Sequence, residues 1–161
     1  MMKKIMFALL LAVVSTSAFA QFEKGTKFVG ANLQGTGFGM GYSKNTDFYI
    51  GLQANAGYFI EDSWMLVGEL GWAHQNGKSN VGLGAGARYY LQQNGFFFGG
   101  MLKYKHIPAN FNNIYLTPEV GYCFFLNDHV SIEPAIYVDM CMNHFKDFTN
   151  VGLKIGFGYY F

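Results

Sequence analysis

The feature that most constrains the fold of this chain is an alternation of residue types with a period of two. It is clearest in the C-terminal segment VGLKIGFGYYF, residues 151–161. One set of alternate residues there is apolar throughout, whereas the other set consists of glycines, Lys154 and Tyr160. Successive side chains of a β-strand point to opposite faces, so the pattern predicts a strand with one apolar face and one mixed face.

Similar segments recur along the chain and indicate eight strands. The expected hairpin turns lie at residues 61–63, 92–95 and 127–129. The Asn94-Gly95 pair is itself a strong hairpin signal. A first strand within residues 27–43 and a last strand in residues 147–161 complete the set. Because no helical periodicity, linker or charge run interrupts these segments, the sequence predicts an all-β fold.

The two faces of the predicted strands differ in chemical character. One face is apolar, as Trp64, Leu66, Leu70 and Trp72 illustrate. The opposite face carries the residues that we expect to form a lumenal charge network: Glu69, Arg88, Lys103, Glu119, Glu133, Asp139 and Lys154. A soluble barrel exposes its charges to water, whereas a membrane barrel places apolar side chains against lipid and polar ones in its lumen. Only 13% of the residues are charged, against ~25% in a typical soluble domain, which favours the membrane arrangement.

Aromatic residues on the apolar face recur at a spacing that fits a bilayer. Trp64 and Trp72 lie eight residues apart, which is about 26 Å along a strand. With a strand tilt of ~40° this becomes roughly 20 Å, close to the height of the apolar band between two aromatic girdles. Phe96 and Tyr104 repeat the spacing. The predicted aromatic girdle therefore consists of Trp64, Trp72, Phe96, Tyr104 and Tyr159.

The first twenty residues predict export from the cytoplasm. Lys3 and Lys4 precede the apolar run IMFALLLAVV, and Ala18-Phe19-Ala20 forms an A-x-A cleavage site. The apolar run is about half the ~20 residues that a spanning helix needs. We therefore predict a secretory signal peptide in residues 1–20, cleaved before Gln21, and a single β-barrel domain in residues 21–161.

Taken together, these features resemble the small eight-stranded outer-membrane β-barrels of the OmpA/OmpX-like class. The resemblance covers residues 27–161 and depends on the signal peptide, the strand count, the inverted faces and the aromatic C-terminal strand. It implies a closed, antiparallel, up-and-down transmembrane barrel, monomeric and surrounded by outer-membrane lipid, with both chain ends on the periplasmic side. It also implies that Phe157, Tyr159 and Phe161 form the signal read by the barrel-assembly machinery.

The lumen composition bears on the function of such a barrel. Eight strands enclose a lumen about wide enough for side chains to fill, and the predicted charge network nearly balances acids against bases. We therefore expect a structural or cell-surface interfacial role without enzymatic activity, cofactor or metal. A narrow, porin-like transport or sensing pore is the alternative, and a lipid-modifying enzyme is a third possibility. With 11 basic and 10 acidic residues, no basic excess supports nucleic-acid binding.

Two other patterns invite functional interpretations that we consider weaker. Gly82-x-Gly84-x-Gly86 resembles part of a phosphate-binding loop, but it lies within a strand and no helix follows. We interpret these glycines as making room for long inward side chains such as Arg88. The histidines, His74, His106, His129 and His144, fall at strand ends or in loops. A metal or hydrolase site could be built from them, but we interpret them as interface residues.

Strand register gives two geometric expectations. The turn at residues 127–129 would pair Leu126 with Val130, so paired residue numbers in this hairpin sum to 256. Cys123 and Cys141 would then lie eight residues out of register, about 26 Å apart along the strands and too far apart for a disulfide. Lys103 and Glu119 each lie seven residues from the expected turn ends of their strands, which predicts an ion pair between them.

Overall fold

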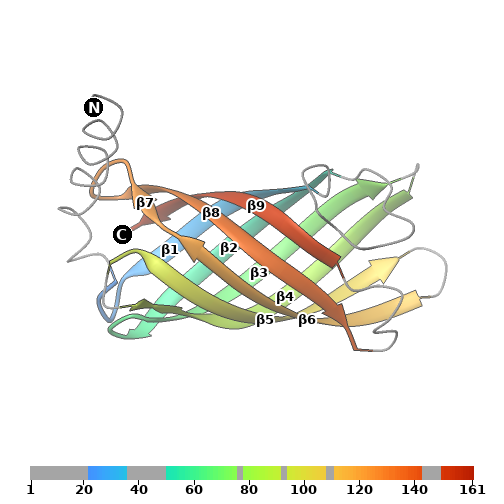
Figure 1. The fold of residues 1–161 in the computed structure, drawn as a ribbon, viewed down its shortest axis with the longest axis horizontal. Helices are drawn as coiled ribbons and strands as arrows, with labels where there is room; N and C mark the ends of the chain where they lie inside the picture. Colours follow the sequence, from blue (N-terminus) through green and yellow to red (C-terminus); the bar gives the residue numbers. More distant parts are fainter. Residues whose placement is uncertain (1–21, 36–49, 76–77, 92–93, 108–110, 143–149) are drawn as a thin grey trace, which may run out of the picture.

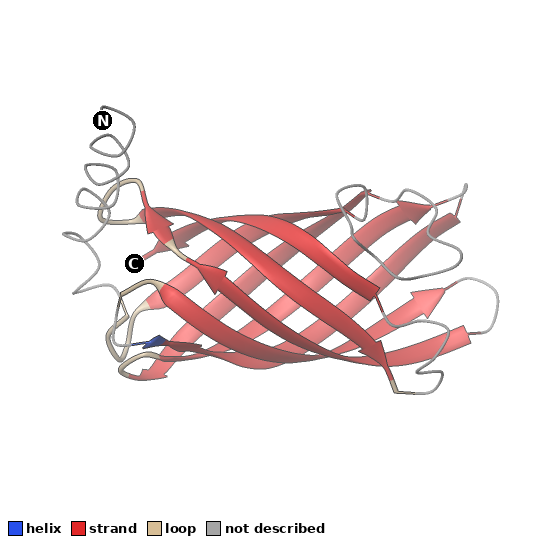
Figure 2. Cartoon of the chain, in the orientation of Figure 1, coloured by secondary structure: helices blue, strands red, loops and turns tan. Residues whose placement is uncertain are grey.

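The structure is a computed structural model that describes residues 22–35, 50–75, 78–91, 94–107, 111–142 and 150–161. The predicted signal peptide, residues 1–20, lies outside these residues. Figure 2 shows that the described residues are almost entirely β-strand, with short turns at one end. None of the described residues belongs to a helix long and apolar enough to cross a membrane.

The strands are β1 (Lys27–Gly35), β2 (Ile50–Glu61), β3 (Trp64–Gln75), β4 (Lys78–Tyr90), β5 (Phe96–Ile107), β6 (Phe111–Tyr122), β7 (Phe124–Phe125), β8 (Val130–Cys141) and β9 (Asn150–Tyr160). Strands β6 and β7 are two parts of one strand, interrupted at Cys123. Both parts pair with β8, and the paired residue numbers sum to 256 in each, as the turn length predicts. The sheet therefore consists of eight full-length strands, as expected.

The sheet closes on itself to form a barrel (Figure 1). Consecutive strands pair antiparallel, and β1 also pairs with β9 over eight residue pairs. Just beyond these pairs, the backbone groups of Lys27 and Phe161 exchange two hydrogen bonds of 2.8 and 2.9 Å. The end of the barrel that carries Phe161 is called the terminal end below. The predicted closed, eight-stranded, antiparallel β-barrel is confirmed.

Alternation along the strands separates an apolar outer surface from a polar interior. On β3, Leu70 is 59% exposed, whereas the adjacent Glu69 is 6% exposed. All members of the predicted aromatic girdle face outward, namely Trp64, Trp72, Phe96, Tyr104 and Tyr159. Phe157 and Phe161, the other members of the predicted assembly signal, also face outward. The exposed large apolar side chains surround the barrel, so an apolar medium suits the outer surface better than water.

Glycines on the inner face make room for the charged side chains. A Cβ added at Gly84 would lie 3.3 Å from Cγ of Lys103 and 3.4 Å from Cβ of Glu69. A Cβ added at Gly99 would lie 2.6 Å from Cγ of Glu119. A side chain at Gly84 would therefore crowd its neighbours, and one at Gly99 would displace the side chain of Glu119. The geometry around Gly84 agrees with the packing interpretation of the glycine-rich segment.

The connection between β2 and β3 is shorter than the sequence indicated. Strand β2 continues to Glu61 through an irregular register after Phe59, and β3 begins at Trp64. The predicted turn at residues 61–63 is therefore shortened to Asp62 and Ser63. Ser63 takes a left-handed conformation with φ of 68°, and its backbone N–H and C=O both form hydrogen bonds that hold it there.

The cysteine positions agree with the predicted register. Cys141 pairs with Tyr115, and both Cys123 and Cys141 are buried free thiols. Titration of the unfolded, unreduced protein with a thiol reagent should therefore detect two sulfhydryls per chain. In the folded barrel the same reagent should react slowly, because both side chains are buried. A reading of no free thiol after unfolding would contradict the register.

The outward position of Leu70 leads to a second prediction. Leu70→Arg should lower the free energy of unfolding by about 2 to 4 kcal/mol, because a charge near the middle of the apolar band must leave water. Urea unfolding from lipid vesicles would measure the change. Gly71→Ser is the matched control, since this neighbouring residue faces the lumen and its added Cβ would lie 3.6 Å from Cγ of Gln53. Equal stabilities of Leu70→Arg and the wild type would show that the faces are inverted.

Candidate functional site in the barrel interior

The barrel interior has two layers, and the layer at the terminal end is aromatic. We call it the aromatic plug; its members are Phe22, Phe28, Phe59, Tyr90, Phe97, Phe125 and Tyr160. All except Phe125 are buried, and ring centroids of neighbouring members lie 4.1 to 6.4 Å apart. Apart from the closer stack of Phe22 on Tyr90, these spacings are those of favourable aromatic pairs. The plug therefore fills the cross-section of the lumen with apolar side chains at this end.

Phe22 lies at the centre of the plug and was not predicted from the sequence. It precedes β1, is 0% exposed, and stacks on Tyr90 with a centroid separation of 4.1 Å. Its ring also contacts those of Phe59, Phe125 and Tyr160 at 5.5 to 6.0 Å. Its carbonyl oxygen accepts a hydrogen bond of 2.8 Å from the backbone N–H of Ser63. The segment before the first strand thus folds back into the mouth of the barrel.

Residues that follow Phe22 attach this segment to the turn between β2 and β3. The backbone N–H of Lys24 donates to Oδ1 of Asp62 at 2.9 Å, and its ammonium pairs with Oε1 of Glu61 at 2.6 Å. The hydrogen bond to Glu61, and then the charge of that carboxylate, raise the pKa of Lys24. Both side chains are exposed, so this pair orients the segment but contributes little to stability.

The second layer of the interior contains ion pairs centred on Arg88. Its Nε donates to Oε1 of Glu119 at 2.7 Å, and a terminal guanidinium nitrogen donates to Oε2 of Glu133 at 2.9 Å. Lys154 also pairs with Glu119. The guanidinium lies 4.7 Å from the ring centroid of Phe97, within the range of a cation–π contact. Arg88 therefore links the charged layer to the aromatic plug.

A hydrogen bond to Glu133 is the second contact that joins the two layers. Its Oε1 accepts from the hydroxyl of Tyr160 at 2.7 Å and from that of Ser131 at 2.9 Å. The hydroxyls of Tyr160 and Tyr90 lie 3.2 Å apart. The hydroxyl of Tyr160 thus satisfies a buried carboxylate and contacts the hydroxyl of Tyr90, which leaves both rings to fill the terminal end.

Farther from the terminal end, two more ion pairs bridge the lumen. Lys103 pairs with Glu69 at 3.0 Å, and Lys105 pairs with Asp139 at 2.9 Å. Asp139 also accepts a hydrogen bond of 2.6 Å from Thr117. Lys105 was not among the predicted residues, although its separation of two residues from Lys103 gives it the same inward parity. The structure places all seven predicted charged residues inside the barrel and adds Lys105 to them.

The predicted ion pair between Lys103 and Glu119 is wrong. In the register of β5 and β6, Lys103 lies opposite Tyr115, whereas Glu119 lies opposite Gly99. The two charges are therefore four positions apart, which is about 13 Å along the strands. Counting from expected strand ends failed because β5 and β6 are staggered: Phe96 pairs with Tyr122 rather than with Leu126. Each charge instead finds a partner two strands away, Lys103 with Glu69 on β3 and Glu119 with Arg88 on β4.

Several polar atoms on β1 to β3 have no hydrogen-bond partner among the described residues. They include Nδ2 of Asn32, both amide atoms of Asn55 and Oε2 of Glu69, all on residues no more than 6% exposed. Buried polar groups of this kind are ordinarily satisfied by water. The interior beyond the plug is therefore more suited to water than the terminal end is.

The histidines do not form a recognisable metal centre in the described part of the chain. No group of three or more His, Cys, Asp or Glu residues there has a metal-binding arrangement. His106 and His129 are exposed, and Nδ1 of His129 lies 2.8 Å from the carbonyl oxygen of Tyr160. The side chains of His74 and His144 lie outside the described residues.

A pair of double-mutant cycles tests the charge arrangement. Lys103→Met combined with Glu69→Gln should show a coupling above about 1 kcal/mol in the free energy of unfolding, because the two groups are in contact. Lys103→Met combined with Glu119→Gln should be additive within about 0.5 kcal/mol, because those groups are not paired. Urea unfolding from lipid vesicles would measure both cycles. Stronger coupling to Glu119 than to Glu69 would contradict the arrangement.

Comparison with known proteins gives structural matches only. No protein-family model and no curated protein sequence matches the chain. The N-terminal β-barrel domain of Pseudomonas aeruginosa OprF matches with a TM-score of 0.61 and 12% identity, over 86% of this chain and 98% of that one. Neisserial surface protein A matches with 0.61 and 13%, over 84% and 96%. The Yersinia pestis outer-membrane protein Ail, in a phospholipid nanodisc, matches with 0.59 and 14%, over 86% and 100%.

At these identities the matches establish the fold alone, and the geometry agrees with it. The barrel is closed, its outer surface is apolar and its interior holds the charges. Both properties are those of a barrel embedded in lipid. The chain therefore has the closed eight-stranded β-barrel fold of these small outer-membrane proteins, and its apolar outer surface is suited to lipid.

Proposed function

We propose that this barrel does not conduct solutes and that its role is structural or at the cell-surface interface. The observation that carries the proposal is the aromatic plug. A water-filled pore needs a continuous polar path, whereas the plug places packed rings across the lumen at the terminal end. Phe22 contributes most directly, because it occupies the centre of the mouth and is 0% exposed.

The charged layer supports the same proposal. An ion that passed the plug would next meet Arg88 and Lys154, which are already paired with Glu119 and Glu133. Breaking a buried pair of this kind typically costs about 3 to 5 kcal/mol, because one charge is left without its partner. Selectivity filters instead present rings of charge that bind ions weakly and release them. The two layers therefore act as successive barriers.

The porin-like pore remains the alternative, with a specific observation in its favour. The unpartnered polar atoms of Asn32, Asn55 and Glu69 suit a hydrated region in the half of the lumen away from the terminal end. Under our proposal that region ends at the plug and does not connect the two sides of the membrane.

We also propose that the barrel is not an enzyme and that it acts as a monomer. A lipid-modifying activity, the third possibility, would change the number of acyl chains on outer-membrane lipids. Mass spectrometry of lipids extracted from cells with and without the protein would detect such a change. We expect the two lipid profiles to be the same.

Single-channel recording in planar bilayers tests the closed lumen. The wild-type protein should produce no stable conductance steps, whereas a sixteen-stranded porin in the same bilayer should, because its wider lumen is filled with water. Stable, reproducible steps from the wild-type barrel would contradict the proposal and favour the pore.

The plug itself can be tested by stability. Phe22→Ala should lower the free energy of unfolding by about 3 to 5 kcal/mol, since it removes a fully buried ring from packed neighbours. Phe22→Leu should cost less, because it keeps most of the apolar volume. Urea unfolding from vesicles gives both values. A cost of Phe22→Ala below about 0.5 kcal/mol, as at ordinary surface positions, would mean that the segment before β1 does not occupy the mouth.

A further inference from the structure

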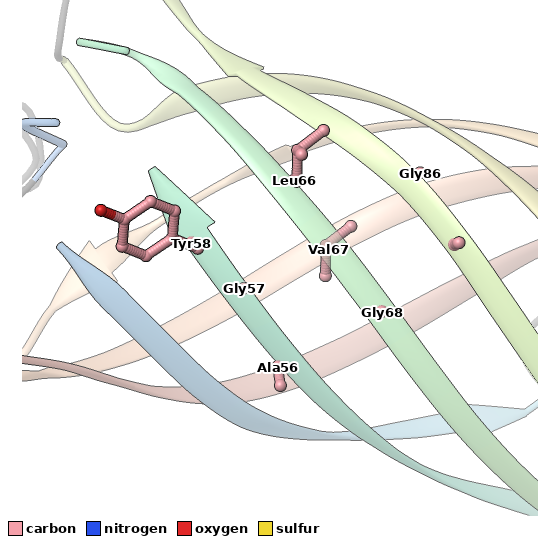
Figure 3. Close-up of a pocket in the computed structure, with 8 residues that line it drawn as sticks. Ala56, Gly57, Tyr58, Leu66, Val67, Gly68 and Gly86 are labelled. Atoms are coloured by element: carbon pink, nitrogen blue, oxygen red, sulfur yellow. The ribbon is translucent and has the colours of Figure 1, made fainter. Parts of the chain in front are cut away.

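The lipid-facing surface has a shallow groove of about 510 Å³ over β2, β3 and β4 (Figure 3). Its floor follows one row of the sheet, in which Ala56 pairs with Gly68 and Gly68 pairs with Ala85. Figure 3 shows Tyr58 and Leu66 standing above this floor on the side of the terminal end.

The groove exists because Ala56, Gly68 and Ala85 have small side chains, whereas each flanking row contains two large ones. The next row away from the terminal end pairs Leu70 with Leu83, which are 59% and 56% exposed. The next row toward the terminal end pairs Tyr58 with Leu66, which are 48% and 50% exposed. A slender apolar group can therefore approach the backbone here more closely than on the surrounding surface.

The terminal end of the groove has polar groups that the floor lacks. The hydroxyl of Tyr58 points away from Ala56 and Gly68 on the floor (Figure 3). Lys27 is the register partner of Tyr58 on β1 and is exposed. Its ammonium lies 5.8 Å from the ring centroid of Phe161 and, among the described residues, forms no ion pair with a carboxylate. A phenol hydroxyl thus lies at the edge of the groove, and the neighbouring strand carries a lysine whose ammonium lies over Phe161 and must turn toward the groove to reach a ligand there.

We propose that this groove binds one phospholipid of the bilayer leaflet at the terminal end. One acyl chain lies over Ala56, Gly68 and Ala85, and the phosphate accepts hydrogen bonds from Tyr58 and Lys27. The anionic headgroup of a phospholipid matches the polar terminal end of the groove, and its acyl chain matches the apolar floor. The inference rests on the outer surface facing lipid and is independent of whether the lumen conducts.

Close packing and headgroup contacts determine the preference of the groove for a lipid. An acyl chain gains no hydrophobic transfer energy when it leaves other acyl chains for an apolar groove, so packing against small residues must favour the site. A lysine near the membrane surface favours an anionic lipid by about fivefold in affinity. Occupancy should therefore depend both on the shape of the floor and on Lys27.

Native mass spectrometry of the barrel after reconstitution with equal amounts of phosphatidylglycerol and phosphatidylethanolamine tests the proposal. The wild type should retain one phospholipid, and Lys27→Gln should reduce the retained phosphatidylglycerol by about fivefold. Gly68→Leu should reduce retention of both lipids at least as much, because its side chain would fill the floor. An added Cβ at Gly68 meets only backbone oxygens at 4.0 Å, so the barrel should accept the substitution.

Gly100→Leu is the matched control for this experiment. Gly100 faces lipid on β5, does not line the groove, and has no atom within 4 Å of an added Cβ. This variant should retain lipid as the wild type does, and a shift in gel mobility on boiling should confirm that each variant is folded.

Three results would overturn the proposal. They are a wild-type barrel that retains no phospholipid, equal loss of lipid in Gly68→Leu and Gly100→Leu, and a wild-type dimer that Gly68→Leu converts to a monomer. The last result would assign the groove to contact between two copies of this chain. Conductance by the wild-type barrel would contradict the proposed function but leave the lipid site unaffected.

Discussion

The pairing of β1 with β9 is the interaction on which the rest of the structure depends. A bilayer interior contains no water to satisfy backbone N–H and C=O groups, so a sheet with open edges cannot exist there. The hydrogen bonds between Phe161 and Lys27, and the pairs that follow them, remove both edges. Closure also separates a lumen from the lipid, and only then do the two faces of each strand have different surroundings.

Within that lumen, charges and rings stabilise one another. Arg88 is 1% exposed and could not remain buried without Glu119 and Glu133. Those carboxylates in turn depend on Lys154 and on the hydroxyl of Tyr160, whose ring belongs to the plug. The barrel interior is thus one connected network of packing and hydrogen bonding, although its two layers differ in polarity.

Much of this arrangement could be predicted because alternation and turn length act locally. The turn at residues 127–129 determined the register of its hairpin. The alternation of side chains along a strand assigned the adjacent residues Leu70 and Glu69 to opposite faces. The partner of Lys103 could not be predicted in the same way, because it depends on the stagger between β5 and β6 and on contacts across the lumen. Phe22 was missed because it lies outside every alternating segment. The only local signal is Gly25, whose φ of 94° lets the chain turn between Phe22 and β1.

The position of Phe22 also has a consequence for the order of folding. Its ring contacts side chains of β2, β4, β7 and β9, which span nearly the whole described chain. The complete surface exists only when the last strand has joined the first, so we infer that Phe22 reaches its final position late in assembly of the sheet. Contacts formed that late slow unfolding without accelerating folding. We therefore expect the segment before β1 to lower the unfolding rate of a barrel that has already closed, and so to prolong its lifetime.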